Sequence, residues 1–388
     1  MPVAFDCIDS QGNHYVDDDG LAKDGMVVLD KDELTLTFSD VKESLIPVIL
    51  GNFSAPAKVH NDLSATQLLS VFQYANDSFN RWDALQSLYS WCISCYEKGT
   101  PEAIDDAIWQ GLKTVLTSEA NNHELLGECL VIPSFETLCQ SRSQVDVATL
   151  NHARDAFCQT FSNTLAEPLK AIYASIETPA YTYSQEAVNA RRCRNQVLVH
   201  LARLDDQQTA IEAQFEQADN MTDTLGALKA AQAGHKQVFE NLMAKFEQRW
   251  NQDPLVLDKW FGLHATSERD DILSQLTLLQ QHPQFTIGNP NRVRAVVGSF
   301  AFFNTAGFHN LDGSGYKFVT DYLMELDKVN PQVAARIVTP LTQWHNFSQA
   351  HQELMKAQLN RLLGVKDLSS DLFEKVSKSL AYQSNSEQ

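Results

Sequence analysis

Residues 123–128 read His-Glu-Leu-Leu-Gly-Glu and begin like the zinc-protease motif H-E-x-x-H. That motif places two imidazoles four residues apart on one helix face, so that both bind the same zinc ion. Here the second imidazole position holds Gly127, and Glu128 is rotated by about 100° around the helix from that position. The sequence therefore predicts no zinc site here, and none at the other histidines.

Cys92 and Cys95 have the C-x-x-C spacing of a redox motif, but they lie in a helix-like run with no strand pattern before it. We expect them to be buried helix cysteines. The chain has seven cysteines, an odd number that fits free thiols in a reducing compartment better than a disulfide framework. The first residues also lack the pattern of a signal peptide, so the expected location is the cytoplasm.

Two glycine-containing segments resemble ion-binding or phosphate-binding loops. Residues 17–20, Asp-Asp-Asp-Gly, begin like a calcium loop, but the twelfth position holds Val28 instead of glutamate, so a hairpin turn is predicted. Residues 312–315, Asp-Gly-Ser-Gly, have neither the G-K-[ST] ending nor the third glycine of the nucleotide-binding loops, and they predict a turn before a helix. No G-x-S-x-G elbow occurs, so residue chemistry alone predicts no active site.

The charge of the chain argues against nucleic acid as a partner. Its 49 acidic and 30 basic residues give a net charge of −19, which repels phosphate backbones. One predicted helix carries four arginines close to Asp205 and Asp206, and we interpret it as a solvated face. No apolar run of about 20 residues predicts a membrane helix. Those four arginines are Arg191, Arg192, Arg194 and Arg203.

The hydrophobic pattern predicts two parts of different secondary structure. Alternating residues in the first part predict strands near residues 3–7, 34–38 and 45–53, with turn residues between them. From about Asp62 onward the spacing of apolar residues is helical, and no strand pattern returns. The predicted fold is mainly α: a short β-sandwich remnant at 1–58, followed by an α-helical superhelix at 59–388.

Three predicted helices begin with the same device, a capping residue followed by proline. They start at Asp253-Pro254, Asn289-Pro290 and Asn330-Pro331. Proline suits the first helical position, and Asp or Asn caps it. The starts are about 40 residues apart, which matches the helix-pair periods of HEAT-like and armadillo-like solenoids. A curved stack of helices with a concave face is therefore expected.

Several segments resemble the C-terminal part of bacterial aminopeptidase N, a gluzincin zinc aminopeptidase family. The resemblance runs in unbroken order from Pro2 to Ala381. The segments that carry it are Arg81–Leu88, Asn220–Asp223, Asp258–Phe261, Asn289–Arg294, Phe308–His309, Asp312–Tyr316, Asn330–Ala334 and Leu368–Leu380.

This resemblance implies only the last two parts of a four-domain enzyme, the small β-sandwich and the helical superhelix. The zinc motif H-E-x-x-H and the G-x-M-E-N segment have no counterpart here. The resemblance thus implies an enzyme as the parent protein but no catalytic residue and no metal ligand in this chain, with zinc held by a catalytic domain elsewhere. Because Met1 aligns with the middle of the sandwich, we expect a fragment of a longer polypeptide.

In the resembled family the helical domain closes over the catalytic domain and lines an internal chamber that peptides enter. Two lining arginines match Arg294 and Arg336, and a neighbouring wall position matches Gln332. The helical pattern fits, because Gln332 and Arg336 share one face while Val333 and Ile337 fall in the apolar stripe. Pro340 is expected to interrupt that helix. Guanidinium groups suit peptide carboxylates or carbonyls, although solvated positions or local ion pairs remain the alternative.

Two functional hypotheses follow. In the first, the chain is the noncatalytic C-terminal part of an aminopeptidase, its partners being the catalytic domain of the same polypeptide and peptide substrates. In the second, it is a freestanding helical-repeat interaction module. An upstream H-E-x-x-H in the same reading frame would favour the first.

Overall fold

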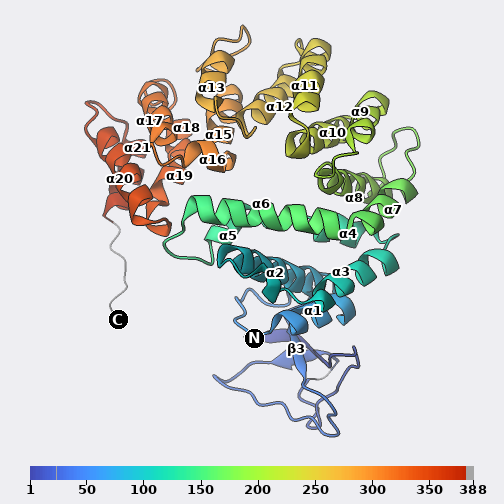
Figure 1. The fold of residues 1–388 in the computed structure, drawn as a ribbon. Helices are drawn as coiled ribbons and strands as arrows, with labels where there is room; N and C mark the ends of the chain where they lie inside the picture. The colour runs from blue at the N-terminus through green and yellow to red at the C-terminus, as the bar shows by residue number, and fades with distance from the viewer. Residues whose placement is uncertain (23, 382–388) are drawn as a thin grey trace. The chain divides into compact units, whose positions relative to one another are not determined.

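The computed structural model describes residues 1–22 and 24–381, and it forms two compact units (Figure 1). The first unit combines Met1–Pro133 with Ala153–His235, and the second combines Ser134–His152 with the chain from Lys236 onward. Helix α6 (Val147–Thr164) contributes its first turns to the second unit and the rest to the first. The fold is mainly α with a short N-terminal sheet, as predicted.

The sheet has three antiparallel strands in the order β2-β1-β3. β1 (Pro2–Ile8) is central, β2 (Met26–Val28) pairs with its first half, and β3 (Ile46–Ile49) pairs with its second half. The alternation predicted near residues 3–7 places Val3 and Cys7 in the interior. Asn80 ties the sheet to the helices, because its side-chain amide donates to the carbonyl oxygen of Ile49 over 2.7 Å.

The prediction of a strand at 34–38 is wrong. In the described part of the chain these residues form no strand, although positions 34, 36 and 38 remain half-buried. The Asp18 amide donates to the backbone carbonyl oxygen of Thr37 over 2.8 Å. The Phe38 ring lies 6.4 Å from the Phe5 ring, so the alternation reflects packing on the sheet and not ladder pairing.

Residues 17–20 form a turn, but it lies in the connection between β1 and β2 and does not directly join two paired strands, so the prediction of a hairpin turn is confirmed only for the turn. The buried Asp17 carboxylate accepts the backbone N–H groups of Leu21 and Ala22, at 2.6 and 2.9 Å. Gly20 has a φ of 65°, which glycine adopts without strain. The Asp17 carboxylate is thus hydrogen-bonded to the backbone of the turn itself.

Several helices of the first unit begin at polar side chains that cap their first N–H groups. Ser64 and Gln67 form a capping box at the first helix, and Asp77, Ser184 and Asn220 cap later ones. The α-helices of this unit are α1 (Ala65–Tyr74), α2 (Ser78–Glu97), α3 (Asp106–Ser118), α4 (His123–Cys129), α6, α7 (Ala166–Ser175), α8 (Gln185–Leu201), α9 (Gln208–Gln217) and α10 (Met221–Gly234).

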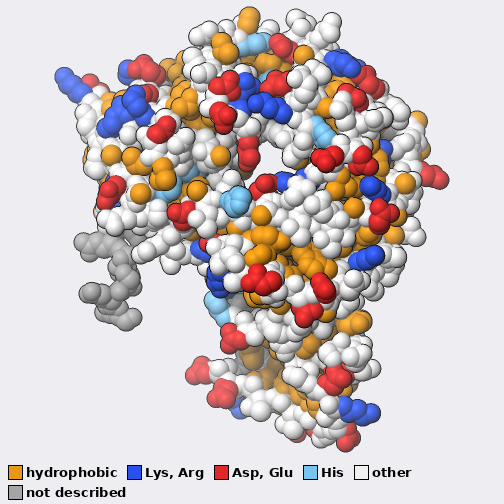
Figure 2. All heavy atoms as spheres, viewed as in Figure 1, with side chains coloured by type: hydrophobic (Ala, Val, Ile, Leu, Met, Phe, Trp, Pro, Cys, Tyr) orange, Lys and Arg blue, Asp and Glu red, His pale blue; other side chains and the backbone are white. Residues whose placement is uncertain are grey.

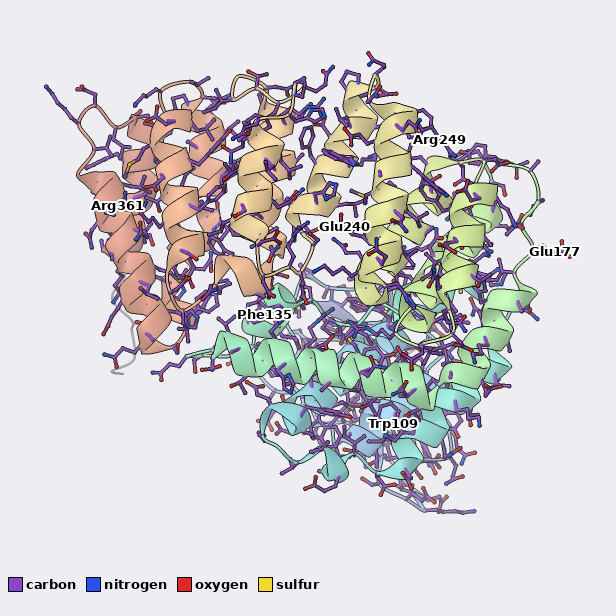
Figure 3. The ribbon with its side chains drawn as sticks, turned by 45° about the horizontal axis from the view of Figure 1, so that its top comes forward. Trp109, Phe135, Glu177, Glu240, Arg249 and Arg361 are labelled. Atoms are coloured by element: carbon purple, nitrogen blue, oxygen red, sulfur yellow. The ribbon has the colours of Figure 1, made fainter. Side chains whose placement is uncertain are left out.

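Aromatic and sulfur-containing side chains fill the core of this unit. Trp109 of α3, labelled in Figure 3, stacks on Phe157 of α6 with ring centroids 6.1 Å apart. Cys92 and Cys95 are buried in α2 as expected, and burial raises the pKa of both thiols. All seven cysteines are buried, and none of them forms a disulfide. The C-x-x-C spacing is therefore a core feature of the helix.

The second unit is a series of short and medium helices. The caps Asp253, Asn289 and Asn330 all accept backbone N–H groups at the predicted helix starts. Its helices are α5 (Phe135–Cys139), α11 (Lys236–Trp250), α12 (Pro254–Ala265), α13 (Ile272–Gln280), α14 (Pro290–Val293), α15 (Ser299–Phe303), α16 (Thr305–Phe308), α17 (Ser314–Leu326), α18 (Pro331–Ile337), α19 (Thr339–Thr342), α20 (Gln349–Leu363) and α21 (Ser370–Leu380).

Neighbouring helices of this unit are joined by ion pairs and aromatic contacts. Arg361 of α20 donates to Asp321 of α17 over 2.7 Å, and Glu240 of α11 accepts from Arg269 over 3.2 Å. Phe135 of α5 lies 5.9 Å from His309, ring to ring. Arg361, Glu240 and Phe135 are labelled in Figure 3. The helices that carry the candidate site are thus fixed by contacts within their own unit.

Candidate functional site

Arg294 lies at the start of a π-helical segment, Arg294–Gly298, which directly follows α14. Its side chain is exposed, and its guanidinium Nη1 donates to Asn291 Oδ1 over 2.9 Å. Single π-helical turns widen a helix by one residue and occur frequently at functional sites. Within this segment Arg294 is exposed, whereas Val296 and Val297 are buried.

Arg292, two residues earlier, fixes this turn from the inside. It is 1% exposed and forms an ion pair with Asp258. Its guanidinium carbon lies over the Phe261 ring, 5.1 Å from the ring centroid. It also donates to the backbone carbonyl oxygens of Gln284 and Pro254, at 3.0 and 2.9 Å. A buried arginine with an ionic partner and two carbonyl acceptors is a rigid anchor.

The α14 turn and α18 meet at Gly298. A methyl group on Gly298 would lie 3.6 Å from Cβ of Arg294 and 3.9 Å from Cδ1 of Ile337. Both distances are ordinary van der Waals contacts, so the two elements pack side by side at this position. The segment that carries Arg294 is thus a direct neighbour of the helix that carries Gln332 and Arg336.

Gln332 and Arg336 are both exposed on α18, whereas Val333, Ala334 and Ile337 are buried. The division of faces predicted from the sequence is confirmed for this helix. The helix ends at Ile337, and α19 begins at Thr339 with a proline in its first turn, as expected for an interruption near Pro340.

Lys375 of α21 adds a cation that the sequence analysis missed. Its Nζ donates to Thr339 Oγ1 over 2.6 Å, and Thr339 Oγ1 in turn donates to the carbonyl oxygen of Arg336 over 2.6 Å. Burial, and then the nearby Arg336 charge, lower the pKa of the Lys375 amine. A signal was present, because Lys375 lies one turn from the buried Leu372 and beside the buried Val376.

The prediction that four arginines form one solvated helix face is wrong for two of them, Arg194 and Arg203. Arg192 is exposed and pairs with Glu128, but Arg194 is half-buried and donates to Gln214 and Tyr173, at 2.7 and 3.0 Å. Arg203 lies beyond the end of α8. The physical reason is that the polar partners of Arg194 come from α7 and α9, which the sequence of α8 does not reveal.

Arg191 and Arg194 line a pocket of about 600 Å³ in the first unit. The loop that follows α7 and carries Glu177 forms one side of it, and Glu177 is labelled in Figure 3. Arg191 stacks on Tyr181, with 4.9 Å between the guanidinium carbon and the ring centroid. The Asp219 carboxylate accepts from Asn220, which lowers its pKa. The polar groups of this pocket are largely paired with one another.

No metal site is assembled by residues 1–22 and 24–381. Nowhere among them do three His, Cys, Asp or Glu side chains lie together so that they could hold an ion. Gly127 of α4 packs against Arg192 and Cys193, with backbone and side-chain atoms 3.4 Å from the position of a Cβ. An imidazole at that position would therefore meet α8 and not a metal.

Acidic and basic side chains are interspersed on the visible side of each unit in Figure 2, without a continuous basic surface. The described helices include none that is both long and apolar enough to cross a membrane.

The chain is similar to known aminopeptidases over nearly its whole length. It is 37% identical to aminopeptidase N of Haemophilus influenzae over 93% of the chain and 42% of that protein, and 35% identical to the Escherichia coli enzyme over 98% and 45%. A solved structure of Legionella pneumophila aminopeptidase A with aspartic acid superimposes with a TM-score of 0.86 at 25% identity, covering 98% of this chain and 45% of that one. The chain thus spans less than half the length of these relatives.

Two family descriptions divide the sequence. Residues 1–62 match a domain of unknown function with an Ig-like fold, DUF3458, and residues 65–381 match DUF3458_C, described as ARM repeats. The hypothesis of an aminopeptidase C-terminal part is therefore supported over that of a freestanding interaction module. The chain belongs to the DUF3458_C family of ARM-repeat domains and is homologous to the noncatalytic C-terminal portion of bacterial aminopeptidase N.

Proposed function

We propose that this chain lines and restricts the substrate chamber of a zinc aminopeptidase that removes N-terminal residues from peptides in the cytoplasm. Its partner is the catalytic domain of the same polypeptide. The observation that carries the proposal is the exposed pair Gln332 and Arg336 above a buried apolar stripe, in a chain aligned to aminopeptidase N over 98% of its length.

Arg294, Gln332 and Arg336 contribute positioning. A guanidinium group offers five N–H donors in a fixed plane, which suits carboxylate and backbone carbonyl oxygens of an extended peptide. The amide of Gln332 can both donate and accept, so it fits a peptide bond. These groups hold the part of the peptide beyond the scissile bond and leave its chemistry to the catalytic domain.

The donor set of this chain does not fit zinc, because α4 presents Gly127 where the second imidazole is required and the residues around it belong to the packed α4–α8 contact. The zinc of the parent enzyme is accordingly assigned to the missing catalytic domain. No step of the reaction is assigned to residues described here.

We also infer that the chain divides into a β-sandwich part at 1–58 and a helical part at 59–388, of which residues 382–388 lie outside the described residues. The last strand ends at Ile49, and the first long helix begins at Ala65. The cytoplasmic location is supported by seven buried free thiols.

A chimera tests the proposed function. This chain replaces the homologous C-terminal 45% of the Escherichia coli enzyme, and hydrolysis of alanyl p-nitroanilide and of a pentapeptide is measured. We expect a folded, active chimera. A chimera that folds and binds zinc but hydrolyses neither substrate would contradict the proposal, with the unaltered parent enzyme as the control.

A further inference from the structure

Arg336 and Lys375 are two cations without a carboxylate partner in an acidic chain. Across the described residues neither forms an ion pair, although the net charge is −19. Neighbouring cations of the same unit are paired: Arg361 with Asp321, and Lys378 with Glu374. Glu374 precedes Lys375 directly, yet its carboxylate is held by Lys378, one turn further along α21.

Hydrogen bonds through the Thr339 side chain hold the Lys375 ammonium group near the backbone of Arg336. α18 packs against α21. The hydrogen-bonded relay from Lys375 through Thr339 to the Arg336 carbonyl group fixes Lys375 beside the C-terminal turn of α18. Lys375 is half-buried and Arg336 is exposed, so the pair offers one ammonium group held by Thr339 and one solvent-exposed guanidinium group.

Two adjacent like charges repel each other, and burial makes this costlier because water screens the repulsion less. The lowered pKa of Lys375, caused first by burial and then by Arg336, is the expected consequence. An anion bound between them would remove this penalty. Thr339 uses one of the three ammonium donors, which leaves two for a ligand, and the Arg336 guanidinium forms no hydrogen bond within the described residues.

We propose that Arg336 and Lys375 together form a carboxylate-binding site, and that its ligand is the C-terminal carboxylate of a short peptide. The carboxylate follows from the two unpaired cations. The choice of a peptide rests on the proposed function, since a short peptide has only one backbone carboxylate and it lies at the end opposite the residue removed. Lys375 then sets a preference for peptides whose length brings that carboxylate to the site.

The direct test is an NMR titration that measures how tightly N-acetyl-trialanine binds to the full chain. The acetyl group removes the amine, so that the carboxylate is the only charge. We expect the free acid to bind and its C-terminal amide to bind at least about tenfold more weakly, the loss that one charged hydrogen bond entails. Lys375→Met should weaken binding of the free acid by a similar factor, whereas Lys375→Arg should bind the acid nearly as tightly as the natural chain does.

Lys378→Met is the matched control, because Lys378 lies on the same helix but is exposed and paired with Glu374. Equal weakening by Lys375→Met and Lys378→Met would show a general charge effect and overturn the site. An acetylated tripeptide amide with a central aspartate tests the other source of a carboxylate. If it binds as well as the free acid, the C-terminal assignment is wrong. Inorganic phosphate that competes at a lower concentration than the acid would overturn it as well.

A second readout follows Lys375 itself. With lysine ¹³C-labelled at Cε, the Lys375 signal is assigned as the one missing in Lys375→Arg, and its pKa is measured with and without N-acetyl-trialanine. We expect the pKa to rise with the acid and to stay constant with the amide; a pKa unmoved by the acid refutes the site. These measurements need no catalytic domain. If the chimera is inactive but the chain still binds the free acid, the chamber role is rejected and the carboxylate site stands.

Discussion

At the scale of single residues, burial holds three histidines of the chain neutral. It lowers the pKa of His200 from its usual 6.5 to about 4, that of His264 to about 4 and that of His309 to about 3. His200 Nε2 donates to the carbonyl oxygen of Leu130 over 2.7 Å. Because the unfolded chain binds a proton that the folded chain rejects, each group favours unfolding as pH falls below about 6.5.

The corresponding prediction concerns His200→Gln, which keeps a side-chain donor for Leu130 but cannot titrate. From pH 7.5 to pH 5.0, the unfolding free energy of the natural chain should fall by about 2 kcal/mol more than that of the variant, because only the natural chain has the His200 imidazole. Urea unfolding at the two pH values measures the difference. His60→Gln, at an exposed position, is the control and should follow the natural chain. Parallel pH profiles for the natural chain and His200→Gln would contradict a neutral buried imidazole.

At the scale of elements, glycines decide how closely two segments approach. The position of a Cβ on Gly234, at the end of α10, lies 1.8 Å from the carbonyl oxygen of Ala202, just after α8. Gly262 in α12 is different, since its nearest neighbours, Ser299 Oγ and the Ala295 carbonyl oxygen, are 3.6 and 3.8 Å away.

We therefore expect Gly234→Ala to destabilise the chain by about 1–3 kcal/mol, because backbone atoms must separate. Gly262→Ala should be neutral or stabilise by up to about 1 kcal/mol through helix propensity. Thermal unfolding followed by circular dichroism compares the two. A Gly234→Ala variant as stable as Gly262→Ala would show that the α8–α10 contact is looser than described.

The elements also show what the sequence could predict. Helix starts at Asp253, Asn289 and Asn330 were predictable, because capping involves only residues within one turn. The strand at 34–38 was predicted wrongly because alternation reports burial on one face, and ladder pairing depends on a partner strand. The exposed face of α18 was predictable from its own period, and its role as a chamber wall stays a prediction.

The residues that sequence reasoning missed have partners far away in the chain. Arg292 is anchored by Asp258, 34 residues earlier, and Lys375 bonds to Thr339, 36 residues earlier. Arg194 was assigned to solvent although Gln214 and Tyr173 bind it. Each of these side chains lies on a helix whose own pattern allows several orientations, and only the neighbouring helix selects one.

At the scale of the whole molecule, the division of labour predicts that this chain alone is not a peptidase. The purified chain should neither retain stoichiometric zinc nor hydrolyse alanyl p-nitroanilide, because position 127 lacks an imidazole. Elemental analysis after dialysis and a chromogenic assay measure the two properties. One tightly held zinc per chain, together with activity that a chelator abolishes, would refute the assignment.

The chamber role predicts an effect of substrate length in the chimera with the Escherichia coli catalytic portion. A pentapeptide extends beyond the scissile bond, whereas alanyl p-nitroanilide carries only one residue. If Arg336 contacts the distant part, Arg336→Ala removes binding that ground state and transition state share, so KM for the pentapeptide should rise about tenfold with little change in kcat. KM for alanyl p-nitroanilide should stay constant. Arg361→Ala is a matched control, because Arg361 belongs to the same unit and is paired with Asp321. Equal effects of Arg336→Ala on both substrates would place its action in folding or domain assembly, since only a contact with the distal peptide distinguishes the two lengths.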